Sequence, residues 1–166
     1  MACAYARTSI RVVNVELNRW LYKGGHPNLI ARSIGRGWAA LSAMGIWPSR
    51  LSALEVRGRR SGKPVLLPVV VANYRGERYL VSMLGPHAGW VRNVRAAHGK
   101  AVLRHGHSER VVLEPVPVAK RDAILKRYLE VAPAARAHFP LQPNASLGQF
   151  RKIAGRYPVF RVRKAG

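Results

Sequence analysis

The stretch from Arg57 to Lys63 concentrates positive charge in a short turn. Four cationic side chains, at positions 57, 59, 60 and 63, stand around Gly58 and Gly62 in the sequence RGRRSGK. A tight turn between strands needs glycines, but it gains nothing from like charges, which repel one another. Guanidinium and ammonium groups crowded in this way suit the oxygens of a phosphate or a carboxylate. The segment is therefore a candidate anion-binding loop, with a solvent-exposed charged hairpin as the alternative.

A second segment, residues 80–96, offers groups that could complete such a site. Its sequence, LVSMLGPHAGWVRNVRA, runs from a strand-like stretch through Gly85 and Gly89 into a helix-like stretch. This arrangement presents backbone amides and a helix N-terminus to an anion. Trp90 and Asn93 add an aromatic face and an amide. If the two segments adjoin in the fold, they form a pocket for a flat ring attached to a phosphate.

Several other catalytic chemistries lack the residues that they need. Asp122 is the only aspartate, and the pattern predicts it on a helix surface, which disfavours a Ser-His-Asp triad. The glutamates mostly stand at strand ends or beside an arginine, where exposed ion pairs account for them. His105 and His107 flank a predicted turn without a carboxylate cluster, so we interpret them as solvent-facing residues and predict no metal site. The sequence contains neither a Walker loop nor a GxGxxG motif.

Composition narrows the class of partner. The chain has 166 residues, which favours a single domain over 1–166, and 48% of them are apolar, which is typical of a globular fold. Lys plus Arg number 29 against 7 Asp plus Glu, a net charge of +22, so the expected partner is an anion. Nucleic acid, an anionic membrane surface and a phosphorylated or polycarboxylate cofactor all qualify. Nucleic acid is the least favoured, because no aromatic platform for stacked bases accompanies the arginines.

The first fifty residues differ from the rest of the chain. Apolar residues recur there at helical spacing: Ile10, Val13, Leu17, Trp20 and Leu21. The segment 1–50 is therefore predicted to be helical, covering the core or lying on an anionic membrane surface. No uncharged window approaches the roughly 20 residues that cross a bilayer. With Cys3 as the only cysteine, we expect a cytoplasmic protein, with peripheral attachment to the inner face of the cell membrane as an option.

From residue 51 onward, the pattern predicts an antiparallel sheet with helices around it. Strands are expected at 53–57, 64–74, 78–84, 100–105, 110–116 and 157–163. Helices are expected at 90–97 and 119–132, and the proline-rich segment 133–149 is expected to be a loop. Pro68, inside the second strand, indicates a strand edge or a bulge. The segment 51–166 is thus predicted to be a small barrel-like α+β domain.

The order of these motifs resembles the deazaflavin-dependent nitroreductase family, oxidoreductases of actinobacteria that use coenzyme F420. The family pattern is a G-[RK]-[RK]-[ST]-G-x-P loop between strands, a later Gly-containing loop, and a Trp-x-x-Asn helix. This chain carries the pattern as GRRSGKP from Gly58, then as Gly85, Trp90 and Asn93. The resemblance covers about residues 54–112, with a weaker RYPVFRV near the C-terminus.

The resemblance implies a split β-barrel, antiparallel with flanking helices, like that of flavin reductases and other FMN-binding proteins. It implies that the phosphate and glutamate tail of coenzyme F420 is held by Arg59, Arg60, Ser61 and Lys63. It implies that the deazaflavin ring is lined or closed by Pro68, Met83, Leu84, Gly85, Trp90 and Asn93. FMN or haem bound in the same fold is the alternative.

The implied activity is hydride transfer from reduced F420 to a small, lipophilic organic acceptor, such as a quinone-like compound, an enone or a nitro compound. The coenzyme carries the chemistry, so no acid–base pair is required. Family members that reduce quinones and nitroimidazoles place tyrosines over the ring from the segment after the penultimate helix. Here that segment offers only Tyr128 and His138, which we take as candidate proton donors, with packing and solvent exposure as the alternatives. A homodimer is a common assembly of this fold.

Overall fold

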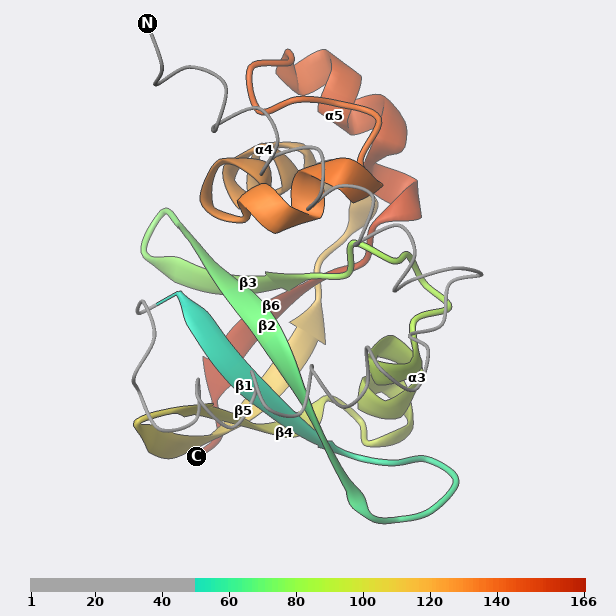
Figure 1. The fold of residues 1–166 in the computed structure, drawn as a ribbon, viewed down its shortest axis with the longest axis vertical. Helices are drawn as coiled ribbons and strands as arrows, with labels where there is room; N and C mark the ends of the chain where they lie inside the picture. The colour runs from blue at the N-terminus through green and yellow to red at the C-terminus, as the bar shows by residue number, and fades with distance from the viewer. Residues whose placement is uncertain (1–49) are drawn as a thin grey trace, which may run out of the picture.

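The computed structural model describes residues 50–166, which form a closed antiparallel β-barrel with helices around it (Figure 1). The order around the barrel is β1-β2-β3-β6-β5-β4, and pairing between β1 and β4 closes it. The strands are β1 Leu51–Arg57, β2 Pro64–Tyr74, β3 Glu77–Val81, β4 Lys100–His105, β5 His107–Pro115 and β6 Val159–Lys164. The predicted class, an α+β split barrel with flanking helices, is confirmed.

Helices fill the two long connections of the barrel. Helix α3, Gly89–Ala96, joins β3 to β4 and packs against β1. Between β5 and β6, α4 (Asp122–Val131) packs on β2 and on α5 (Leu147–Ile153), so that both helices cover one end of the barrel in Figure 1. Short 3₁₀ turns complete these connections at Val118–Lys120, Pro133–His138 and Ala154–Arg156.

Two apolar clusters hold these layers together. The first lies between the barrel and α3 and includes the fully buried side chains of Leu54, Val91 and Leu113. The second lies under the helical end and is centred on Leu125 and Phe150, both with no exposed surface. Removing one such side chain typically costs about 2–5 kcal/mol of folding free energy. Helix α3 and the barrel are therefore placed by packing as well as by chain connection.

Three expectations differ from the structure. Strand β3 ends at Val81, earlier than predicted, because the Ser82 hydroxyl donates to the carbonyl of Gly85 at 2.8 Å and turns the chain. The segment 133–149 is not a plain loop, since α5 begins within it behind a capping box of Ser146 and Gln149. Asp122 is only 9% exposed and accepts from Arg151 at 3.0 Å, so it is not a free surface residue.

Pro68 lies on a one-sided stretch of β2. Residues 64–70 of this strand pair with β1, and pairing with β3 begins only at Val71. Within residues 50–166, no strand therefore pairs with the other side of β2 at Pro68, where a residue without an N–H is tolerated. The predicted strand edge is confirmed.

The predicted N-terminal helix, with Ile10 to Leu21 on one face, and its contact with a membrane lie outside the described residues. Among residues 50–166, no helix is both long enough and apolar enough to cross a bilayer.

Candidate functional site

The basic segment forms the turn of the β1–β2 hairpin. The N–H of Gly58 donates to the carbonyl of Lys63 at 2.8 Å, and the N–H of Gly62 donates to the carbonyl of Gly58 at 2.8 Å. A Cβ on Gly58 would lie 2.9 Å from Ser61 Oγ and 3.1 Å from the carbonyl of Lys63, so a side chain at Gly58 would crowd the turn. The turn is thus shaped by its own backbone. It leaves the side chains of Arg60, Ser61 and Lys63 exposed.

Arg59 connects this turn to helix α3. Its backbone N–H donates to Asn93 Oδ1 at 3.3 Å, and its Nη1 donates to the same oxygen at 2.9 Å. Nη1 also lies 3.5 Å from the carbonyl oxygen of Gly89, a long hydrogen bond. Asn93 is only 7% exposed. The basic turn and the segment 80–96 therefore adjoin, through one arginine and one buried amide, which meets the condition for a shared pocket.

The segment after β3 lies on the apolar clusters at this side of the barrel. Leu84 and Trp90 both pack on the cluster under α3, and the Trp90 ring meets Phe160 with centroids 5.5 Å apart. Met83 packs on the cluster under the helical end. Gly85 has a φ of +78°, and its N–H donates to the carbonyl of Ser82 at 3.2 Å. This conformation favours glycine, and it turns the chain from β3 toward α3.

The exposed cations of the turn have no acidic partner in the described part of the chain. Every described acid is paired elsewhere, at N···O distances of 4.0 Å or less. The pairs are Glu55–Arg104, Glu77–Arg161, Glu109–Arg78, Glu114–Arg161, Asp122–Arg151 and Glu130–Arg127. The charge of Arg60 and Lys63 is therefore uncompensated, which is the donor chemistry that a ligand with several anionic groups needs.

The two candidate proton donors lie on the helical side of the barrel. Tyr128 is 4% exposed in the cluster under the helices, and burial raises the pKa of its hydroxyl. Packing in this cluster accounts for the position of Tyr128. His138 is half-buried, and burial lowers the pKa of its imidazole, which favours the neutral form. Its carbonyl accepts from the Tyr157 hydroxyl at 2.9 Å.

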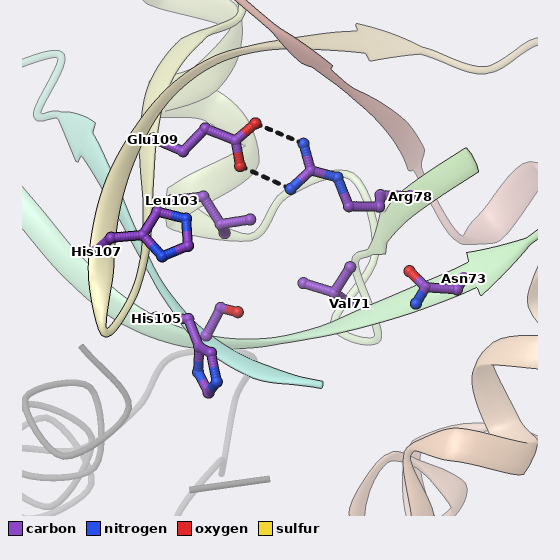
Figure 2. Close-up of a pocket in the computed structure, with 8 residues that line it drawn as sticks. Val71, Asn73, Arg78, Leu103, His105, His107 and Glu109 are labelled. Atoms are coloured by element: carbon purple, nitrogen blue, oxygen red, sulfur yellow. Dashed lines mark hydrogen bonds and ion pairs between the residues drawn. The ribbon is translucent and has the colours of Figure 1, made fainter. Parts of the chain in front are cut away.

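A hollow of about 190 Å³ at another part of the barrel was not predicted from the sequence (Figure 2). It is lined by Ser52, Val71, Asn73, Arg78, Leu103, His105, His107 and Glu109. Ser52 stands at the start of β1, whereas the basic turn follows the last residue of that strand. The length of β1, roughly 20 Å, therefore separates the hollow from the basic turn. The expectation that His105 faces solvent is wrong, because it is half-buried with Nδ1 3.0 Å from the carbonyl of Leu51. Among residues 50–166, no three potential ligands converge on a metal position.

Arg78 and Glu109 close one wall of this hollow with two hydrogen bonds of 2.7 Å, drawn as dashed lines in Figure 2. The Arg78 hydrogen bond holds the pKa of Glu109 below its usual range. The ionised pair therefore stabilises the fold above the pKa of an unfolded glutamate, and this stabilisation is lost as pH falls through the lower, folded pKa.

We expect Glu109→Gln to lower the free energy of unfolding by about 1 kcal/mol at pH 7, the upper end for a partly exposed pair. The difference from the unsubstituted protein should shrink below about pH 4.3, where an unfolded glutamate becomes protonated. Urea unfolding at several pH values measures it. Glu130→Gln is the matched control, because Glu130 pairs with Arg127 within α4 by a single hydrogen bond of 2.8 Å. Equal losses in both variants, or a difference independent of pH, would contradict this account.

The sequence profile of the F420H₂-dependent quinone reductases matches residues 41–139 of this chain. The chain belongs to this family. It is an oxidoreductase with coenzyme F420 as its cofactor, which confirms the resemblance seen in the motifs. The profile spans the basic turn, the Gly85 segment and α3. No curated protein matches the chain in sequence.

Solved structures similar to this F420H₂-dependent reductase share its fold at low sequence identity. One, described as a domain-swapped dimer, is 16% identical with a TM-score of 0.52, covering 81% of this chain and 93% of that one. A protein of unknown function from Agrobacterium tumefaciens is 14% identical with a TM-score of 0.51, covering 83% of this chain and 55% of that one. An F420-H2 dependent reductase, FDR-A, is 17% identical with a TM-score of 0.48, covering 69% and 95%.

Proposed function

We propose that this chain transfers a hydride from reduced coenzyme F420 to a small, lipophilic acceptor of the quinone type, with enones and nitro compounds as further acceptors of the same kind. One observation carries the proposal. Arg59 joins the basic turn to α3, so that the uncompensated cations of the turn lie next to the helix that carries Trp90 and Asn93. A ligand that combines an anionic tail with a flat ring matches the cations of the turn and the aromatic residue of this helix.

Each part of the site has a separate task in this proposal. Arg60, Ser61 and Lys63 hold the anionic tail, because their side chains are exposed on the turn. The backbone of Met83, Leu84 and Gly85, together with Pro68, lines the ring, and Trp90 excludes water from one side of it. When bound, the coenzyme supplies the hydride. The residues of the chain need only bind it, orient it and keep water away from the reacting atoms.

Further observations bear on the acceptor, the proton source and the assembly. The family name supports a quinone-type acceptor, and the net charge of +22 favours a protein that gathers at an anionic membrane surface, where lipophilic acceptors dissolve. Of the two candidate proton donors, His138 has some exposed surface, whereas Tyr128 is enclosed by the core. The domain-swapped dimer among the similar structures supports a homodimer.

A fluorescence titration tests the coenzyme assignment. We expect F420 to bind with a dissociation constant in the micromolar range or tighter, and FMN to bind at least about 10-fold more weakly. The deazaflavin ring without its phosphate and glutamate tail is the control ligand. It should also bind weakly, because the tail is what contacts the basic turn. Tight binding of FMN without binding of F420 would contradict the proposal.

A further inference from the structure

The contact between Arg59 and Asn93 fixes how the Asn93 amide is turned. Two N–H donors of Arg59, the backbone N–H and Nη1, approach the same atom of Asn93 at 3.3 and 2.9 Å. Only the oxygen of an amide accepts hydrogen bonds, so this atom must be Oδ1. The alternative orientation would point two donors at the amide nitrogen. The geometry therefore assigns the direction of the amide without any ligand.

In this orientation Arg59 does not use the Nδ2 amide group of Asn93, which is a hydrogen-bond donor. Within residues 50–166, no acceptor is hydrogen-bonded to Nδ2, although Asn93 as a whole is only 7% exposed. No buried side-chain nitrogen or oxygen in residues 50–166 lacks a partner, so Nδ2 is not a buried unsatisfied donor but one that a water molecule or a ligand can reach. The rest of the side chain is held against the core, because Asn93 lies on the side of α3 that carries the buried Val91 and Val94.

We propose that Arg59 is a positioning residue and that Asn93 is the direct contact to the coenzyme. Arg59 holds the basic turn on α3 and orients Asn93 so that Nδ2 donates to an oxygen atom of F420. The inference rests on the proposed function, and it revises the role of Arg59 expected from the motif, which was a direct ligand of the phosphate. Both arginines are exposed, but among the described residues only Arg59 has a side-chain hydrogen bond to α3, so the charge of Arg60 is available to the tail.

Two substitutions separate the roles of the residues. Asn93→Asp keeps the shape and the acceptor for Arg59 but removes the donor and adds a negative charge. It should therefore keep the turn on α3 while weakening F420 binding by about 10- to 100-fold, the range for losing a hydrogen bond to a charged ligand. Arg59→Ala removes the side chain that orients Asn93. It should loosen the turn and weaken binding by about 10-fold. Arg59→Lys keeps the charge but not the forked geometry, so it should restore binding only in part.

The first measurement needs no coenzyme. Hydrogen exchange of the amides in residues 58–63 is followed in the free protein and in each variant. We expect faster exchange in Arg59→Ala and unchanged exchange in Asn93→Asp and in Arg60→Ala, because only the first variant removes the side-chain contacts with Asn93 and Gly89. Unchanged exchange in Arg59→Ala would overturn the positioning role.

The second measurement is F420 affinity at low and high salt. Salt screens an exposed charge far more than it alters a hydrogen-bond geometry. The loss caused by Arg60→Ala should therefore shrink at high salt, whereas the loss caused by Arg59→Ala should persist, and the loss caused by Asn93→Asp should shrink only by the part that its added negative charge contributes. A loss in Arg59→Ala that disappears with salt, or wild-type affinity in Asn93→Asp, would overturn the inference. Failure of the unsubstituted protein to bind F420 would instead refute the proposed function, and the exchange data would still report whether Arg59 holds the turn.

Discussion

Reversing the charge of Arg60 and Lys63 together is expected to weaken F420 binding by about 100-fold or more. Both side chains are exposed on the β1–β2 turn, and neither has an acidic partner within residues 50–166. Each charge-assisted hydrogen bond to an anionic tail contributes about a factor of ten or more to affinity. The double variant Arg60→Glu with Lys63→Glu removes two such contacts and adds repulsion. Fluorescence titration measures the change.

The matched control changes the net charge by the same amount at a distance from the turn. Lys120→Glu with Lys152→Glu places the same negative charges on the 3₁₀ turn at Val118–Lys120 and on α5, where both lysines are exposed. Long-range effects of net charge appear equally in both double variants, while direct contacts appear only in the first. Equal weakening in the two proteins would mean that the tail is attracted by overall charge and is not bound at the turn. Because all four residues are on the surface, both double variants should keep the fold, and thermal unfolding checks this.

The barrel and the pairing of its first strands followed from local signals in the sequence. Alternating apolar runs separated by Gly-containing turns predicted all six strands, with β3 too long at its end. The juxtaposition of the basic turn and α3 was a condition of the expected pocket, and the order of the motifs along the chain did not establish it. The Arg59–Asn93 contact was not predicted, because the two residues are 34 positions apart and the pattern of residue types does not say which arginine of a cluster contacts α3. That choice depends on where packing places α3.

Helix α5 and the hollow beside His105 and His107 were not predicted from the sequence either, for two different reasons. Helix α5 had a local signal, the Ser146 and Gln149 capping box, but the prolines and alanines before it outweighed that signal in the prediction. The hollow beside His105 and His107 had no local signal at all. Its walls come from β1, β2, β3, β4 and β5, which meet only when pairing between β1 and β4 closes the barrel. Surfaces formed by closure are therefore harder to predict than turns and caps.

Gly99→Ala is expected to lower the free energy of unfolding by about 3 kcal/mol or more, because it combines backbone strain with a steric clash. Gly99 has a φ of +80°, and a Cβ at this position would lie 2.8 Å from the carbonyl oxygen of Leu113. The N–H of Leu113 also donates to the carbonyl of Gly99 at 2.8 Å. Because this hydrogen bond holds the two backbones together, they have no room to separate. Urea unfolding measures the loss.

Gly76→Ala is the matched control for this effect. Gly76 has nearly the same φ, +77°, but a Cβ there would meet nothing within 4 Å. It should therefore lose only about 1 kcal/mol, the cost of the backbone conformation alone. Similar losses at the two glycines would show that the close approach to Leu113 relaxes without cost. The Gly99 variant should also bind F420 more weakly than the Gly76 variant. The N–H of Gly99 donates to the carbonyl of Val94 at 2.9 Å, and this bond ties the end of α3 to the start of β4. Strain at Gly99 therefore displaces the helix that carries Trp90 and Asn93.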